Sequence, residues 1–266
     1  MFCYSLRRAV PDCPITIYVR GDPNQEVVNA CQCDFVVGYA PKYPSHLSTT
    51  NALRFVDDPS GRYDYWYLTD ADFVFLPHDP PFPDYYVAKA KKWSDGVYWG
   101  ARGPKRGSLK RIRGGCFLAG REWYEKTAEL REKYAKELKL GKLGKTREDD
   151  ETMLWKICAG SGLACPTKRG NKRKAKYKEI HLGDFKFEHR WTDHRKMSAN
   201  ISDSNMLKWF RLQEDDKWLE IRKICEQDGH IAQIMKNVDT YMEERRKIYR
   251  EKCRVRDSVL QAKSDS

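Results

Sequence analysis

Two carboxylates separated by one small residue, Asp70 and Asp72, are the side chains in this sequence best placed to do chemistry. They follow an aromatic, apolar run over residues 63–69 that is typical of a buried strand, and a second apolar run begins at residue 73. Two acids at one strand end repel each other unless a cation lies between them, and carboxylate oxygens suit Mg²⁺ or Mn²⁺. The spacing therefore predicts a divalent metal site that could hold a diphosphate. The alternative is a turn in which Asp70 caps the following segment.

Glycines and acids follow further along the chain. Gly114 and Gly115 lie in an apolar strand pattern over residues 114–120, where paired glycines allow a ligand to approach the backbone or mark a β-bulge. Asp149 and Asp150 belong to an acidic cluster that opens an amphipathic helix. Helix capping and the helix dipole could explain these acids, and a second acidic group of an active site is the other interpretation.

A third motif, His-x-Gly-x-x-Lys, is formed by His181, Gly183 and Lys186. An imidazole can complete a carboxylate-rich site for Mn²⁺, the glycine lets the backbone approach phosphate, and the ammonium offsets charge on a leaving diphosphate. His181 could instead be a structural histidine. His189 and His194 lie nearby as alternative ligands.

In this order, the motifs resemble those of nucleotide-sugar-dependent glycosyltransferases of the GT-A fold. His-x-Gly-x-x-Lys resembles the motif of the retaining glycogenin-like and lipopolysaccharide galactosyltransferase-like enzymes, although Phe187 and Glu188 follow it here where that family often has Pro-Trp. The resemblance covers residues 1–190. It implies an enzyme, a hexosyl- or pentosyltransferase, that uses Mn²⁺ or Mg²⁺ and a nucleotide-diphosphate sugar, with a UDP-sugar preferred.

The resemblance also implies a role for each residue. Asp70, Asp72 and His181 would hold the metal. Asp150, with Asp149 next, would contact the sugar or the acceptor. The motif favours retention of anomeric configuration, and inversion with either of these two acids as base stays open. The residues that would contact the donor are Arg54, Asp70, Gly114, Gly115, Gly183 and Lys186.

The pattern around the motifs predicts an α/β protein. Expected strands are residues 15–19, 34–39, 63–69, 97–101 and 114–120, and expected helices are residues 1–10, 24–33, 48–56, 121–140 and 147–157. The resemblance implies a GT-A, Rossmann-like mixed sheet flanked by helices. Its first strand is absent, because the chain begins after the place where that strand would lie. We therefore expect either a truncated chain or a rebuilt sheet.

Two domains are expected: a catalytic domain over residues 1–200 and a basic helical appendage over residues 201–266. Apolar residues recur at helical spacing in the appendage as far as residue 242, and a charged, basic helix follows. This segment could be a lid, an oligomerisation surface, an acceptor-binding module, a membrane-surface helix or a solvated helix.

The net charge of +12 favours a polyanionic partner. Our preferred acceptor is 5-hydroxymethylpyrimidine in DNA, as in bacteriophage base-modifying glucosyltransferases. The alternatives are a lipopolysaccharide, lipid-linked or protein acceptor, and a non-catalytic nucleic-acid-binding protein; the basic clusters could also be a solvated surface. The basic residues expected to contact the acceptor are Lys105, Arg106, Lys110, Arg111, Arg113, Lys172, Arg173 and Lys174.

Nine scattered cysteines predict reduced thiols rather than a disulfide framework or a zinc site. The sequence has no apolar run long enough for a transmembrane helix and no signal-peptide pattern at its start. We therefore expect a cytoplasmic protein, or one in the host cytoplasm if the protein is viral.

Overall fold

The computed structural model describes residues 1–20, 29, 34–39, 47–59, 63–102, 110–140, 150–165, 179–185 and 201–264. Within these residues the protein is mixed α/β, with eight α helices and three small sheets. This confirms the predicted α/β class, while the finer GT-A arrangement stays a prediction. The chain forms two compact units: residues 13–71 with 79–175, and residues 1–12 with 72–78 and 176–266.

Two sheets lie in the unit of residues 13–71 and 79–175. In the first, β1 (Thr16–Arg20) runs parallel to β2 (Phe35–Tyr39). In the second, β3 (Tyr65–Thr69) and β5 (Tyr98–Arg102) pair antiparallel on either side of β6 (Ile112–Gly120). All five segments were expected to be strands. The expected helix over residues 24–33 falls outside the described residues except at residue 29.

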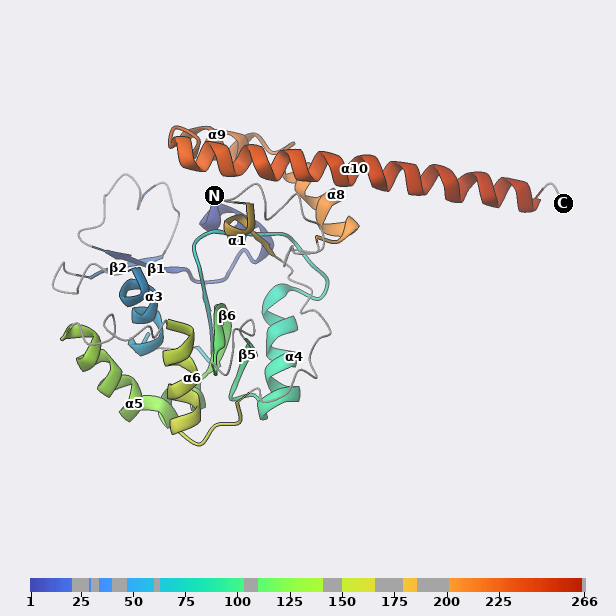
Figure 1. The fold of residues 1–266 in the computed structure, drawn as a ribbon. Coiled ribbons are helices and arrows are strands. Elements are labelled where there is room, and N and C mark those ends of the chain that lie inside the picture. Colours follow the sequence, from blue (N-terminus) through green and yellow to red (C-terminus); the bar gives the residue numbers. More distant parts are fainter. Residues whose placement is uncertain are drawn as a thin grey trace. The chain divides into compact units, whose positions relative to one another are not determined.

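Four helices cover the β3–β6–β5 sheet of this unit. In Figure 1, α4 (Phe82–Ser94) lies on one side of β5 and β6, and α3 (Leu47–Val56), α5 (Arg121–Lys139) and α6 (Asp150–Gly160) lie on the other. Their apolar faces and the sheet enclose one core. Its largest fully buried side chains are Phe55, Tyr98, Ile112, Phe117, Trp123 and Leu138.

The other unit combines both ends of the described chain with a short middle segment. It contains α1 (Phe2–Ala9), the strand pair β4 (Phe73–Phe75) and β7 (Glu179–His181), and the 3₁₀ turn η2 (Leu182–Phe185). The remaining elements are helices, in the order α8 (Asp203–Leu212), α9 (Asp216–Cys225) and α10 (Gly229–Ser264). In Figure 1, α8 and α9 lie along the first part of α10, and its C-terminal part extends beyond them.

Local chemistry accounts for the breaks between these last helices. The Ser202 side chain accepts a hydrogen bond from the backbone N–H of Asn205, 3.2 Å away, and starts α8. Asp215 does the same for the N–H of Trp218, at 2.9 Å, and starts α9. Trp209 and Trp218 then pack edge to face at 6.1 Å in the core of the unit.

The core of this unit joins strands and helices from distant parts of the sequence. Val74 of β4 and Ile180 of β7 are fully buried in one cluster with Trp209, Met235 and Met242. The helices after residue 200 are thus packed on residues that precede it, and the predicted division at residue 200 stays a prediction. None of the helices in the described segments combines the length and the apolarity needed to span a bilayer.

Candidate functional site

Arg54 links two of the acids expected at the site. It projects from α3, and its guanidinium donates a hydrogen bond to the carbonyl oxygen of Thr69 at 3.1 Å, at the end of β3. The same group forms ion pairs with Asp70 Oδ1 and, at 3.3 Å, with Asp150 Oδ2 at the start of α6. One partly buried cation therefore fixes the end of β3 and the start of α6 in the sequence-predicted site.

The glycine pair leaves room for this cation. A Cβ atom at Gly114 would lie 2.8 Å from Arg54 Nη2 and 3.2 Å from Asp150 Oδ2, so a larger residue would displace one of them. The carbonyl of Gly115 accepts a hydrogen bond from Thr69 Oγ1 at 2.8 Å. The β5–β6 register shifts between Gly100 and Arg102, opposite the part of β6 that holds these glycines.

Charges alternate around the start of α6. Burial raises the pKa of Asp150 and the nearby Asp70 raises it further, while Arg54 opposes both effects. Burial and Asp150 likewise raise the pKa of Glu151, and Arg111 and Arg113 of the β6 region oppose that rise. Arg111 Nε lies 4.0 Å from Glu151 Oε2. The acidic helix start therefore faces cations, and Glu151 is a member of the cluster that the sequence did not single out.

Asp72 and His181 meet in the other compact unit. Phe73 pairs with His181 across β4 and β7, and the imidazole stacks on the Phe73 ring at 4.6 Å. His181 Nε2 lies 3.1 Å from Asp72 Oδ2. The backbone N–H of Leu182 donates to the carbonyl of Asp72 at 2.7 Å, which fixes the chain on both sides of the pair. Strand pairing thus joins the Asp-x-Asp and His-x-Gly-x-x-Lys motifs.

Gly183 is the third member of this contact. A Cβ atom there would lie 2.7 Å from Asp72 Oδ2, closer than real Cβ contacts come, and 3.0 Å from His181 Nε2. A larger residue would force one of these side chains to shift, so the glycine leaves the carboxylate and the imidazole in contact. In the sequence its expected role was to let the backbone approach phosphate.

The donor atoms fit a divalent metal. Asp72 Oδ1 is buried and has no hydrogen-bond partner among the described residues, which is rare for a carboxylate oxygen. A carboxylate and an imidazole are ligands that Mn²⁺ accepts. Asp70 is joined to Asp72 through Ala71 alone, so chain connectivity limits their Cα atoms to a separation of about 7 Å. A second carboxylate is thus tethered to the pair.

The structure describes only part of the expected acceptor surface. Lys110 Nζ lies 4.7 Å from the centroid of the Trp155 ring on α6, in a cation–π contact, and Arg111 and Arg113 face Glu151 as above. Several expected site residues lie outside the described residues: Lys105, Arg106, Asp149, Lys172, Arg173, Lys174 and Lys186, together with the alternative ligands His189 and His194.

No protein-family model, curated protein or solved structure matches this chain. The function is therefore inferred from the residues and their geometry.

Proposed function

We propose that this protein is a metal-dependent glycosyltransferase that moves a sugar from a nucleotide-diphosphate sugar to a hydroxyl group of a polyanionic acceptor. The observation that carries the proposal is the contact of Asp72 with His181 over Gly183. It joins two short motifs that are distant in the sequence and leaves a buried carboxylate oxygen without a partner. This combination favours a ligand role over a turn-capping role for the acids and a structural role for the histidine.

The metal-binding residues in this proposal are Asp70, Asp72 and His181. Bound Mn²⁺ or Mg²⁺ would offset the charge of the diphosphate leaving group. The chain itself holds the ligands in place before the metal arrives. The Phe73 ring fixes the plane of the imidazole, and the Leu182 N–H fixes the backbone of Asp72.

Arg54 and Asp150 form, with Asp70, a second group of charged residues in the proposed site. Arg54 orients both carboxylates, and its charge lowers the cost of holding Asp70 and Asp150 close together. Asp150 has a raised pKa because it is buried, so it can exchange a proton with an acceptor hydroxyl closer to neutral pH than an ordinary aspartate. Retention of configuration remains our preferred outcome on the basis of the motif, with Asp150 orienting the sugar or the acceptor.

The preferred acceptor is 5-hydroxymethylpyrimidine in DNA. The net charge of +12 favours binding to a phosphate backbone. The second half of α10 adds exposed cations such as Lys247, Arg250 and Arg254, and Lys110 on the Trp155 ring combines a cation with an aromatic face. A fall in DNA affinity with rising salt is the expected signature.

The test is a transfer assay with a panel of UDP-sugars. The protein is incubated with Mn²⁺ or with EDTA, with or without DNA that contains 5-hydroxymethylcytosine. Nucleoside diphosphate release and the mass of the DNA are measured. Metal-dependent release together with a heavier DNA supports the whole proposal, and metal-dependent release without a heavier DNA retains the transferase and rejects this acceptor. Absence of release with every donor refutes the enzyme.

Two variants test the site directly. Asp72→Asn and His181→Ala each remove a proposed ligand and are expected to lower turnover by more than about 100-fold, because even the partners of metal ligands contribute 10- to 100-fold. Asp64→Asn is the matched control, since Asp64 is 85% exposed and precedes β3. A non-catalytic DNA-binding protein would lose no DNA affinity in Asp72→Asn, so this variant also separates the two classes.

A further inference from the structure

A pocket of about 290 Å³ opens in the unit formed by residues 13–71 and 79–175. It is lined by Asp58, Trp66, Arg121, Tyr124, Glu125 and Ala128. Trp66 lies on β3 four residues before Asp70, which is about 13 Å along an extended strand. The pocket is therefore separate from the candidate metal site, and nothing in the proposed function uses it.

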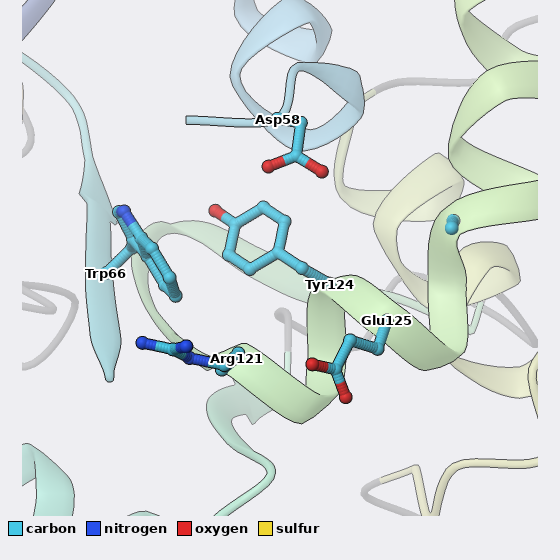
Figure 2. Close-up of a pocket in the computed structure, with 6 residues that line it drawn as sticks. Asp58, Trp66, Arg121, Tyr124 and Glu125 are labelled. Carbon is cyan, nitrogen blue, oxygen red and sulfur yellow. The ribbon is translucent and has the colours of Figure 1, made fainter. Parts of the chain in front are cut away.

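One wall of the pocket is aromatic and carries an unsatisfied hydroxyl group. The rings of Trp66 and Tyr124 meet edge to face at 4.8 Å, and Figure 2 shows the Tyr124 phenol between the Trp66 indole and the Asp58 carboxylate. Tyr124 is 5% exposed, and its hydroxyl has no hydrogen-bond partner among the described residues. A buried hydroxyl without a partner is rare, and here it lies beneath the accessible surface of the pocket.

Arg131 holds this wall in place from behind. It is 4% exposed, and its guanidinium lies 4.8 Å from the centroid of the Tyr124 ring. It donates hydrogen bonds to Asp58 Oδ2 at 3.1 Å, to the carbonyl of Asp57 at 3.2 Å and to the carbonyl of Tyr124 at 3.0 Å. Because one buried cation fixes both the Asp58 carboxylate and the Tyr124 ring, the polar and aromatic groups of the pocket are preorganised.

The charges of the pocket restrict its ligand. Asp58 and Glu125 contribute two carboxylates and Arg121 contributes one guanidinium, and because Arg131 pairs with Asp58 from behind, the charges around the pocket balance. Balanced charges give neither a phosphate group nor a cation a strong net attraction, so they favour a neutral ligand. A neutral ring with several hydroxyl groups satisfies every lining group, because hydroxyls donate to carboxylates and accept from a guanidinium.

We propose that this pocket binds a single neutral pyranose ring, either as a free monosaccharide or as the terminal sugar of a glycan. The apolar face of the ring would stack on Trp66, and its hydroxyls would bond to Asp58, Glu125 and Arg121. The volume of about 290 Å³ lies just below the usual range for ligand pockets, about 300–1,000 Å³, which suits one ring. The proposal does not depend on the glycosyltransferase reaction.

The test is calorimetric titration of the full chain with methyl glycosides of glucose, galactose, mannose and N-acetylglucosamine, with EDTA present throughout. EDTA keeps divalent metals from the candidate site, so a failed transfer assay and a failed sugar titration remain distinguishable. We expect saturable binding of at least one glycoside, with a Kd on the order of 1 mM, as is usual for a small polar ligand in an open pocket.

Variants on the exposed face of α5 locate the binding. Glu125→Ala and Arg121→Ala each remove one charged hydrogen-bonding group and are expected to weaken binding about tenfold, because such a bond contributes about 1.5 kcal/mol or more. Glu129→Ala is the matched control, an exposed glutamate one helical turn further along that does not line the pocket. Trp66→Ala is expected to abolish binding, and circular dichroism checks that it folds.

Three results would overturn the proposal. The first is an absence of saturable binding by every glycoside. The second is binding that Glu125→Ala and Arg121→Ala leave unchanged, which would place the sugar elsewhere. The third is tighter binding of tetramethylammonium than of any glycoside, which would make the pocket a cation site.

Discussion

Replacing Gly183 with alanine is the most direct perturbation of the candidate metal site. The new Cβ atom would lie 2.7 Å from Asp72 Oδ2 and 3.0 Å from His181 Nε2, so one of these side chains must move by several tenths of an ångström. The φ angle of Gly183 is not in the region that only glycine favours, so the effect is steric rather than conformational. Overpacking of this kind costs about 1–3 kcal/mol, and a displaced ligand partner costs about 10- to 100-fold in metal affinity.

Two measurements separate these effects. Titration of Mn²⁺ monitored by electron paramagnetic resonance gives the metal affinity, which is expected to fall at least about tenfold in Gly183→Ala. Urea unfolding gives the free energy of unfolding, which is expected to fall by no more than about 3 kcal/mol. Gly229→Ala at the start of α10 is the control, because a Cβ atom there meets nothing within 4 Å.

The reasoning would be refuted by a Gly183→Ala variant that binds Mn²⁺ as tightly as the wild-type protein. Such a result would mean that Asp72 and His181 tolerate the methyl group without moving as ligands, or that they do not bind the metal. His181→Ala distinguishes the two cases, since wild-type affinity in that variant would remove the histidine from the site.

Three further predictions follow from the charged and nucleophilic groups. Arg54→Ala leaves Asp70 and Asp150 without their shared cation. In urea titrations its free energy of unfolding is expected to be about 3 kcal/mol lower than that of the wild type. A loss below about 1 kcal/mol would contradict the structural role of Arg54. The pKa of Asp150 is raised in the folded protein, so ionisation of Asp150 destabilises the wild-type fold. The unfolding free energy of Asp150→Asn minus that of the wild type is therefore expected to rise as the pH increases above 3.8 and then to level off. A difference that does not change with pH would contradict the shift. A hydrogen bond from Cys158 lowers the pKa of the half-buried Cys165 thiol, while burial raises the pKa of Cys158. Iodoacetamide is therefore expected to label Cys165 at least about tenfold faster than Cys158, as measured by peptide mass spectrometry. Equal labelling rates would contradict this pairing of the two thiols.

Local sequence patterns were sufficient for much of the fold. The expected strand over residues 63–69 and the expected helix over residues 121–140 correspond to β3 and α5, because each combines the right apolar period with a clear boundary. Helix α4 was not expected. It begins after Pro81 and has a second proline, Pro83, in its first turn, where the missing backbone N–H costs no hydrogen bond. The helix was missed because closely spaced prolines usually indicate a loop.

Contacts between distant residues were the part that sequence could not provide. Arg54 and Asp150 are 96 residues apart, and no periodicity encodes their ion pair. The pairing of β4 with β7 is similar, because each strand has three residues and neither shows a strand pattern that identifies its partner. The motifs indicated which side chains matter, and the tertiary structure gives their neighbours. The pocket at Trp66 was missed because its lining residues come from α5, β3 and the segment after α3, which no local pattern brings together.

The pairing of β4 with β7 also has a consequence for how the protein is made. Roughly one hundred residues separate the two strands, so at about 5–20 residues per second a ribosome needs on the order of 5–20 s after releasing β4 before β7 exists. During that interval Val74 and Leu76, which are buried in the finished protein, have neither their strand partner nor the tryptophans of α8 and α9. The nascent chain is therefore a natural client for chaperones that bind extended apolar segments. Stop codons introduced before α8 should yield insoluble product.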